Sequence, residues 1–413
     1  MIAVVGLGFI GLTVALGFAE KGVEVYGVDI DDFRTGLIRN GKIPYFEPGL
    51  DEALERNLNG RFHVLNDLDD VPDGIECFFI CAGSPEVRDG KPDHSRIFRA
   101  IDDIVDAGFE DYYTIAIKTT MIPGTMDEVM VPYLEEKGVE LGVDCGLALN
   151  PEFMREGKCW HDFTNPSRIV IGVSNERDEE VLRRCYAPFD APVVAANYAT
   201  AEFIRYMSST LLATMISYSN EMAAAAKAIG DIDISQAFRI AQMDGRWSEN
   251  TMRGYVYPGL GFGGIFLPKD TRDFIQLANE SGAEVPLLEN VMAINEEIPA
   301  NIAAEIASQV DKDARLGILG LTFKEGSGDV RNSASAKIIQ QLQALGYNNI
   351  CAYDPIANDD FAAAYHMDIS YAFSLRELCD ICDVVIIATP WRQFKVVPEY
   401  AKGKPVFDCR YML

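Results

Sequence analysis

The chain lacks any apolar run approaching the roughly 18 residues needed to cross a bilayer, and it has no tandem repeat or low-complexity segment. We expect no secretory signal peptide, because the apolar run that begins at Ile2 has the pattern of a first strand. We therefore expect a cytoplasmic protein without a membrane partner. Basic residues are also scarce, with 36 Lys and Arg against 63 Asp and Glu and a net charge of −27. Such a chain repels nucleic acid, so an anionic ligand must be bound by locally placed cations or backbone N–H groups.

Cysteine is present, but in no pattern that indicates a disulfide framework or a metal centre. The nine cysteines are odd in number and lie scattered in apolar stretches such as residues 77–81, which predicts free, buried thiols in a reducing compartment. Cys379 and Cys382 have C-x-x-C spacing, but no second pair and no histidine cluster accompanies them. We therefore expect no bound metal.

The length of 413 residues predicts two or three domains at about 150 residues each. A composition of 48% hydrophobic and 24% charged residues is that of a globular protein. In residues 1–196, short apolar runs alternate with helical patterns, which predicts a parallel sheet covered on both faces. The runs expected to be strands are 2–5, 24–28, 77–81, 113–118 and 146–149.

Residues 197–300 have mainly helical patterns, and residues 301–413 return to strand–helix alternation. The segment 201–230 is one long helical pattern rich in Ala, Met and Ser, which indicates a central or dimer-forming helix. The later strands are expected at 316–319, 349–353, 384–388 and 405–408. The sequence thus predicts an α/β protein with two Rossmann-like doubly wound parallel-sheet domains, 1–196 and 301–413, joined by a helical domain, 197–300.

The first predicted strand is followed by Gly6-Leu-Gly8-Phe9-Ile10-Gly11, which opens a helix. In a G-x-G-x-x-G turn the first glycine allows the tight turn, the second lets a pyrophosphate approach, and the third lets the helix pack on the strand. Asp29 ends the second predicted strand, where its carboxylate would bind a ribose 2′-hydroxyl and repel a 2′-phosphate. The pattern favours NAD over NADP; FAD and a glycine turn without a ligand remain alternatives.

Several further motifs occur in a fixed order: residues 41–50 (GKIPYFEPGL), 117–120 (IKTT), 150–156 (NPEFMRE), 261–270 (GFGGIFLPKD) and 320–331. Through them the chain resembles the UDP-glucose/GDP-mannose dehydrogenase family from end to end. The resemblance implies NAD in the first domain, the nucleotide diphosphate of a sugar in the last, and a homodimer formed through the central helices. It also implies oxidation of the primary alcohol of the sugar to a carboxylate with two NAD per turnover.

The resemblance also implies roles for individual residues. Thr120 would position a water, and Glu152 would act as general base. Asp270 corresponds to the family aspartate that follows the catalytic cysteine in the sequence. The implied cofactor contacts are Gly6, Gly8, Phe9, Ile10, Gly11, Asp29, Gly83, Ser84, Thr120 and Arg331. The implied substrate contacts are Glu152, Phe153, Met154, Arg155, Arg205, Arg246, Tyr257, Gly261, Phe262, Gly263, Lys324 and Arg410. For the cations among them, ordinary surface salt bridges are the alternative interpretation, as core packing is for Tyr257.

The sequence departs from the family pattern where a catalytic cysteine is expected. The family loop reads G-F-G-G-S-C-x-P-K-D, whereas this chain has Ile265 and Phe266 at the serine and cysteine positions. A phenyl ring cannot attack a carbonyl to form a thioester. A family lysine and asparagine on the central helix correspond to Arg205 and Ser209, and arginine is not a proton acceptor. These substitutions predict altered chemistry.

We therefore expect an NAD-dependent oxidoreductase of a UDP- or GDP-hexose that performs a single or reversible hydride transfer without a thioester. The alternatives are a conventional 6-dehydrogenase that makes the uronate and a non-catalytic nucleotide-sugar binder. Cys159 is the one thiol near the expected substrate loop, and His161 beside it is a possible general base. For both residues a structural role is the simpler interpretation.

Overall fold

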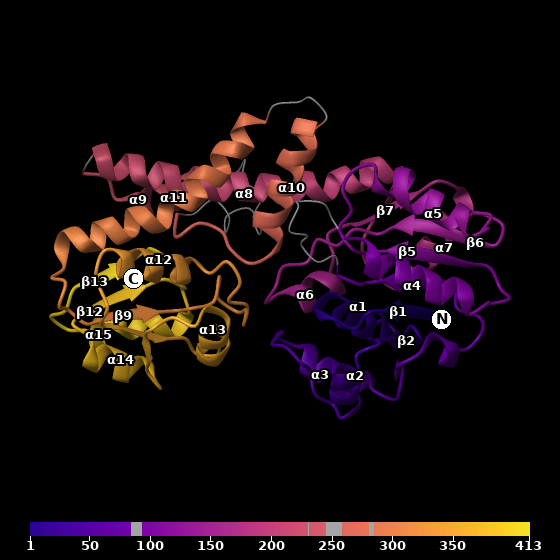
Figure 1. The fold of residues 1–413 in the computed structure, drawn as a ribbon, viewed down its shortest axis with the longest axis horizontal. Helices are drawn as coiled ribbons and strands as arrows, with labels where there is room; N and C mark the ends of the chain where they lie inside the picture. The colour runs from indigo at the N-terminus through magenta and orange to yellow at the C-terminus, as the bar shows by residue number, and fades with distance from the viewer. Residues whose placement is uncertain (84–92, 230, 245–257, 281–284) are drawn as a thin grey trace. The chain divides into compact units, whose positions relative to one another are not determined.

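The computed structural model describes residues 1–83, 93–229, 231–244, 258–280 and 285–413 (Figure 1). Contacts within the chain divide it into two compact units, Met1–Arg205 and Tyr206–Leu413. Each unit contains a sheet with helices on its faces, which confirms the predicted α/β class with a helical region between two sheets. The domain boundaries at 196 and 300 stay a prediction.

The first unit is built on an eight-stranded sheet in the order β3-β2-β1-β4-β5-β6-β7-β8. All neighbouring pairs are parallel except β6 and β7, which are antiparallel. The order reverses between β1 and β4, the switch point where doubly wound sheets bind ligands. The strands are β1 (Ile2–Val5), β2 (Val25–Val28), β3 (Phe62–Leu65), β4 (Cys77–Ile80), β5 (Tyr113–Ile117), β6 (Cys145–Leu149), β7 (Ile169–Val173) and β8 (Val193–Ala196).

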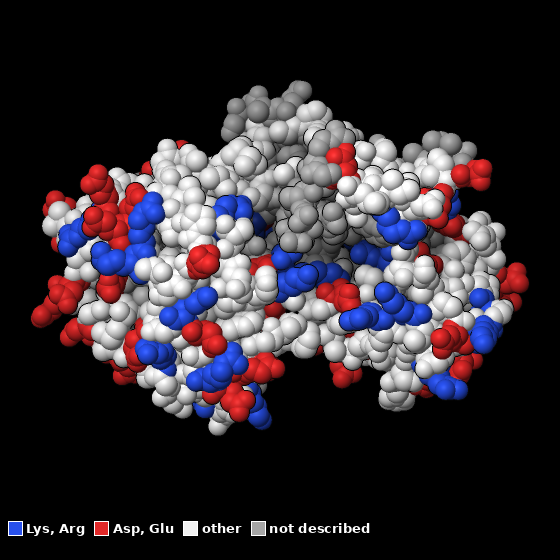
Figure 2. All heavy atoms as spheres, turned by 180° about the vertical axis from the view of Figure 1, so that it is seen from behind, with Lys and Arg blue, Asp and Glu red and all other residues white. Residues whose placement is uncertain are grey.

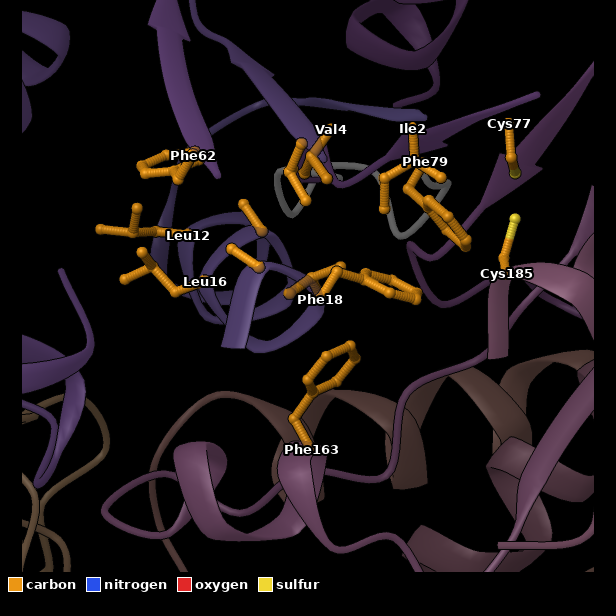
Figure 3. Packing of buried hydrophobic residues seen from close by; sticks show 14 of the residues in the cluster. Ile2, Val4, Leu12, Leu16, Phe18, Phe62, Cys77, Phe79, Phe163 and Cys185 are labelled. Carbon is orange, nitrogen blue, oxygen red and sulfur yellow. The ribbon is translucent and has the colours of Figure 1, made fainter. Parts of the chain in front are cut away.

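The helices of this unit cover both faces of the sheet: α1 (Phe9–Glu20), α2 (Asp32–Arg39), α3 (Leu50–Asn57), α4 (Ser95–Asp106), α5 (Val131–Glu136), α6 (Cys159–Thr164) and α7 (Glu176–Tyr186). Short helical turns lie at Leu68–Asp70 and at η2 (Met126–Met130), which is a π-helical turn. Helix α1 is buried along most of its length, and Phe18 packs against Phe79 and Phe163 (Figure 3). This packing holds α1 against one face of the sheet, with the N-terminus of the helix at the carboxyl end of β1.

Helix α8 (Tyr198–Ile229) starts in the first unit and continues into the second. It begins three residues before the predicted start and ends one before the predicted end. The second unit continues with α9 (Ile234–Ala241), α10 (Phe266–Glu280) and α11 (Pro286–Gln309). Its sheet has the order β11-β10-β9-β12-β13, with all pairs parallel.

The remaining elements of the second unit are β9 (Leu316–Leu319), α12 (Ala334–Ala344), β10 (Ile350–Tyr353), α13 (Asn358–Tyr365), β11 (Ser370–Tyr371), α14 (Leu375–Ile381), β12 (Val384–Ile387), α15 (Val397–Tyr400) and β13 (Val406–Asp408). A short 3-10 turn, η4, covers Arg392–Val396. The predicted strands agree with the structure to within one residue at each end. Strands β3, β7, β8 and β11 were not predicted. Two of them, β8 and β11, contain no fully buried residue, so they lack the apolar run that marks a core strand.

Within the described ranges, no helix is long and apolar enough to cross a membrane. On the face drawn in Figure 2, acidic and basic side chains are interspersed, so the excess of acid does not form one continuous patch there.

Candidate functional site

The glycine turn lies between β1 and α1, where the residues make room for a ligand. Gly6 has φ +92°, a left-handed conformation that favours glycine. A Cβ at Gly11 would lie 1.7 Å from the carbonyl oxygen of Gly6, so helix and strand approach closely only without a side chain here. A Cβ at Gly8, the N-cap of α1, would meet nothing within 4 Å. This open space beside the helix N-terminus suits a pyrophosphate.

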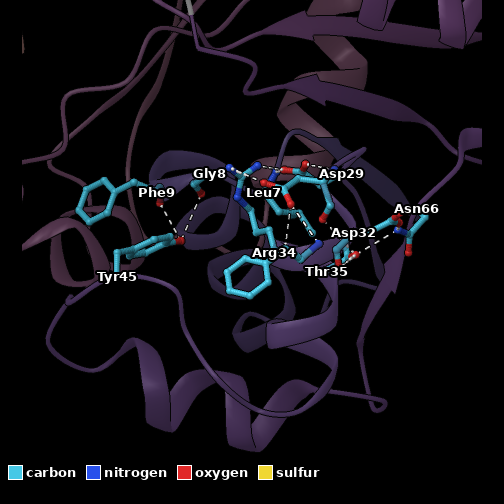
Figure 4. A network of polar contacts seen from close by, with 11 residues as sticks. Leu7, Gly8, Phe9, Asp29, Asp32, Arg34, Thr35, Tyr45 and Asn66 are labelled. Atoms are coloured by element: carbon cyan, nitrogen blue, oxygen red, sulfur yellow. Dashed lines mark hydrogen bonds and ion pairs between the residues drawn. The ribbon is translucent and has the colours of Figure 1, made fainter.

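Asp29 lies next to this turn, at the end of β2 (Figure 4). Its buried carboxylate accepts hydrogen bonds from the Leu7 N–H (2.6 Å) and the Asp31 N–H (2.9 Å). The Arg34 guanidinium on α2 donates a further bond of 2.7 Å to Asp29 Oδ2. Arg34 was not singled out from the sequence. The sequence feature that could have predicted it is a basic residue in the helix that follows the acid at the end of a strand. The pair places a partly neutralised carboxylate where a ribose hydroxyl would bind.

The segment 41–50 extends over the glycine turn and also reaches the loop after β6. The Tyr45 hydroxyl donates to the carbonyl oxygen of Gly8 (3.2 Å), and its ring contacts Phe9 with 5.0 Å between ring centroids. Burial raises the pKa of Tyr45 well above its usual value, so it remains a neutral donor. The buried Glu47 carboxylate accepts the Gly157 N–H at 2.8 Å. One segment therefore holds both the cofactor turn and the expected substrate loop.

Glu152 and Arg205 form a buried ion pair at the edge of the first unit. Arg205 Nη2 lies 3.1 Å from Glu152 Oε1, and both side chains are less than a tenth exposed. Glu152 Oε2 accepts the Met154 N–H at 2.7 Å, which fixes the carboxylate orientation. The structure thus joins two predicted residues that are 53 positions apart in the sequence. Ser209 is also buried and follows one turn later on α8, in the second unit.

Thr120 follows β5 and is partly buried, and its neighbour Thr119 donates to the Ala82 carbonyl oxygen. Strands β4 and β5 pair in parallel, so the segments that follow them, with Gly83 after β4 and Thr120 after β5, lie at the same edge of the sheet. Lys118, which the sequence did not single out, directly follows β5 and is buried. Its ammonium donates to Asn150 Oδ1 at 2.8 Å, and burial lowers the pKa of Lys118. This bond ties the ends of β5 and β6 together.

Other predicted residues on the loop after β6 are already engaged with protein groups. Arg155 makes a bidentate ion pair with Asp162, with Nε–Oδ2 2.8 Å and Nη2–Oδ1 2.6 Å. The Phe153 ring lies under the Arg168 guanidinium, 4.5 Å from ring centroid to the guanidinium carbon. Met154 is buried. The ion pair of Arg155 orients the loop backbone, and a direct role in substrate binding stays a prediction.

In the second unit, the backbone of the glycine loop 258–264 is held by hydrogen bonds to two asparagine side chains. Asn295 of α11 accepts the Phe262 N–H (2.7 Å) and donates to the Phe262 carbonyl oxygen (3.1 Å). Gly261 has φ +84°, and a Cβ at Gly263 would lie 2.3 Å from the Asn332 carbonyl oxygen. Asn332 donates to the Gly264 carbonyl oxygen at 2.8 Å. The loop is therefore a rigid platform that ends directly at α10.

Phe266 is the first residue of α10 and is partly buried, and Asp270 lies fully buried one turn later. Lys269 Nζ is 3.8 Å from Asp270 Oδ1 and 2.8 Å from Asp273 Oδ2. The helix thus begins with a phenyl ring at the end of the glycine platform. No chemical group of this ring can accept a proton or attack a carbonyl.

Three further cations expected at the substrate or cofactor lie in the second unit and have different surroundings. Arg410 is partly buried, with its guanidinium against Gly259, and desolvation lowers the pKa of Arg410. Lys324 Nζ lies 5.4 Å from the Phe323 ring centroid. Arg331 makes a bidentate ion pair with Asp329, both contacts at 2.8 Å, and is largely exposed. Arg331 thus forms a surface salt bridge, and its contact with the cofactor stays a prediction.

Three predicted residues, Ser84, Arg246 and Tyr257, lie outside the described residues.

All nine cysteines are free thiols. Burial raises the pKa of Cys81, at the edge beside Lys118, to about 12, so that thiol is protonated at neutral pH. Cys159 is fully buried at the start of α6. The hydrogen bond from Cys382 lowers the pKa of Cys351 to about 6, but Cys351 is buried in β10. Groups of three or more metal-ligating side chains are not found in the described ranges.

Comparison with known proteins agrees with this geometry over the whole chain. Residues 1–190 match the NAD binding domain of the UDP-glucose/GDP-mannose dehydrogenase family, residues 199–297 its central domain, and residues 317–413 its UDP binding domain. A UDP-glucose 6-dehydrogenase of Haloferax volcanii is 32% identical over 407 residues, covering 96% of this chain and 93% of the relative. A GDP-mannose 6-dehydrogenase of Pseudomonas putida is 31% identical over 422 residues, covering 98% and 95%.

A solved UDP-glucose dehydrogenase of Pyrobaculum islandicum has the same fold, with a TM-score of 0.91 and 32% identity, covering 100% of this chain and 94% of that one. The open space at Gly8 and the carboxylate of Asp29 fit the NAD that the matched first domain binds. The chain therefore belongs to the UDP-glucose/GDP-mannose dehydrogenase family and is an NAD-dependent oxidoreductase that acts on a nucleotide sugar.

Proposed function

We propose that the chain oxidises a CH–OH group of a UDP- or GDP-hexose by a single or reversible hydride transfer and forms no thioester. The observation that supports this proposal is Phe266 at the start of α10, directly after the glycine platform. Family members are expected to carry the attacking cysteine at this position. Without a thiol there, an aldehyde is not held covalently for a second oxidation.

Bound NAD supplies the hydride acceptor. The alcohol proton goes to Glu152, whose carboxylate is already oriented by the Met154 N–H and by Arg205. Arg205 stays cationic and stabilises a developing alkoxide, but it does not accept the proton. Thr120 holds a water near the carboxylate. Arg410 and Lys324 bind the diphosphate of the substrate as cations in a chain that is otherwise strongly acidic.

A conventional 6-dehydrogenase that makes the uronate is the second candidate, and the comparisons favour it. The relatives from Haloferax volcanii and Pseudomonas putida are both named 6-dehydrogenases and match almost the whole chain. In this case the aldehyde would be oxidised as its hydrate, with a water in place of the thiol. The apolar side chains of Ile265 and Phe266 disfavour a water at this position, which is why we place this candidate second.

The stoichiometry of NADH to sugar product separates the candidates. We expect purified protein with NAD and a panel of UDP- and GDP-sugars to give about one NADH per oxidised sugar, and activity that survives alkylation of the accessible cysteines. Two NADH per product would identify the conventional enzyme. Firm binding of a nucleotide sugar without turnover would identify a non-catalytic binder, and an altered sugar without net NADH would identify an epimerase, which is a reversible transfer.

The variant Phe266→Cys, paired with Phe266→Ala as its control, tests the same point from the opposite direction. We expect Phe266→Cys to raise the stoichiometry from one toward two NADH and to become sensitive to alkylation, whereas Phe266→Ala does neither. If the parent chain already yields two NADH and a sugar acyl adduct is trapped on Cys159 or another thiol, the single-transfer proposal is wrong.

We propose in addition that the chain forms a homodimer through α8 and that the protein is cytoplasmic. One face of α8 carries the side chains of Phe203, Met207, Leu211 and Tyr218, which are between 43% and 53% exposed. Their spacing of four, four and seven residues places them on one stripe of the helix. A long apolar stripe on a helix is typical of a surface that another helix covers, and a second copy supplies the same stripe.

The double substitution Met207→Glu with Leu211→Glu tests the dimer. We expect the parent chain to have the mass of a dimer by light scattering at micromolar concentration, and the double variant to have that of a monomer. Phe373→Glu is the control, because Phe373 is also highly exposed but lies outside α8, between β11 and α14. A parent chain that is already monomeric at this concentration contradicts the proposal.

A further inference from the structure

Glu202 on α8 is a buried carboxylate that has no role in the chemistry described above. It is 1% exposed, and both of its oxygens accept backbone hydrogen bonds. Oε2 accepts the Gly124 N–H at 2.7 Å, and Oε1 accepts the Met126 N–H at 2.9 Å. The donors are more than 75 positions away in the sequence, at the start of the π-helical turn η2. The carboxylate therefore joins α8 to the segment that follows β5.

That segment carries Thr120 and is tied down at two points. At its beginning, the Thr119 hydroxyl donates to the Ala82 carbonyl oxygen. At its end, Glu202 holds Gly124 and Met126. The first tie is between neutral groups, whereas the second depends on a carboxylate that can be protonated. The position of Thr120 between the two ties is therefore sensitive to the charge of Glu202.

We propose that Glu202 is a positioning residue, which holds the Thr120 segment at the reacting centre through its two backbone hydrogen bonds. The proposal rests on the proposed function in one respect, the role of Thr120 beside Glu152. Helix α8 also carries Arg205, three residues after Glu202, so one helix sets both the Thr120 segment and the partner of Glu152. The geometry thus couples the two sides of the reacting centre.

The charge state of this carboxylate gives the proposal a pH dependence. Burial raises the pKa of Glu202 to about 7, the two N–H donors lower it, and the charges of Asp127 and Glu128 on η2 raise it further. Tyr198 lies one turn earlier on the same helix and is a neutral group. As the pH falls through about 7, Glu202 is protonated and can no longer accept both backbone hydrogen bonds as a carboxylate. We therefore expect the activity to fall with it.

The test combines three variants with amide hydrogen exchange and kcat measured from pH 5.5 to pH 9, a range of about 1.5–2 units around the expected midpoint. Glu202→Gln is expected to lower kcat at pH 8 by about 10–100-fold, the scale of a misplaced catalytic group, with little change in the KM for the nucleotide sugar. The acid limb near pH 7 should disappear. The amides of Gly124 and Met126 should exchange faster than in the parent chain.

We expect Asp127→Asn to keep the fold because Asp127 is exposed, so this variant stays informative if Glu202→Gln fails to fold. Removing its negative charge lowers the pKa of Glu202, and the acid limb of kcat should move to lower pH. Asp73→Asn, which removes an exposed charge elsewhere in the first unit, is the matched control and should leave the limb in place.

The outcomes separate this proposal from the proposed function. Unchanged exchange at Gly124 and Met126 in Glu202→Gln overturns the anchoring role, whether or not the protein is active. Faster exchange with an unaltered kcat and pH profile overturns the positioning role. If the parent chain turns over no nucleotide sugar, the proposed function has failed, and the exchange data still decide whether Glu202 holds the segment.

Discussion

Replacement of Glu152 by glutamine is expected to lower kcat by about 10²–10⁴-fold while the affinity for NAD stays the same. Glutamine keeps an oxygen that can accept the Met154 N–H, so the loop geometry is retained, but it cannot take a proton from an alcohol. The glycine turn and Asp29 are not involved in this contact. Steady-state kinetics with the nucleotide sugar found by the stoichiometry panel, together with NAD titration, measure both quantities.

The same substitution removes the counter-charge that Arg205 has in the parent chain, which by itself destabilises a buried pair by up to about 3–5 kcal/mol. The double variant Glu152→Gln with Arg205→Met removes both charges and is the control. We expect it to recover most of the lost Tm and none of the lost kcat. If the double variant regains activity, the loss in Glu152→Gln came from misfolding, and Glu152 is not the general base.

Substitution of Gly11 by alanine is expected to impair both the fold of the first unit and the binding of NAD. The added Cβ would lie 1.7 Å from the carbonyl oxygen of Gly6, which is backbone and cannot move aside by a rotamer change. Strand β1 and helix α1 must therefore separate, at a cost of about 1–3 kcal/mol or more. A lower Tm and a weakened NAD affinity in calorimetric titration are the expected results.

Gly8 to alanine is the matched comparison, because a Cβ there meets nothing within 4 Å. We expect this variant to keep the Tm of the parent chain and still to bind NAD less tightly, since the new methyl group occupies the space assigned to the pyrophosphate. Undiminished NAD affinity in Gly8→Ala would mean that the cofactor does not approach the turn at this position.

Much of the fold followed from local patterns. The buried runs 2–5 and 316–319 are strands with the predicted bounds, because a central parallel strand is apolar along its whole length. The antiparallel pairing of β6 with β7 did not follow, since strand direction depends on the path of the connecting loop. The edge strand β11 has two residues, too few to show a period. A sequence window cannot show either feature.

The sequence alone determined the glycine turn, the strand-end acid Asp29 and the phenylalanine at position 266, because each is a matter of residue type and short spacing. Only the tertiary structure decided that Arg34 neutralises Asp29, that Arg205 pairs with Glu152, and that Glu202 holds the segment after β5. The last two contacts join residues 53 and 78 positions apart. A buried charge without a hydrogen-bond or ion-pair partner is energetically costly, so buried charges are usually paired in folded proteins. Which residue becomes the partner depends on how the helices pack on the sheet, and a short stretch of sequence does not show this packing.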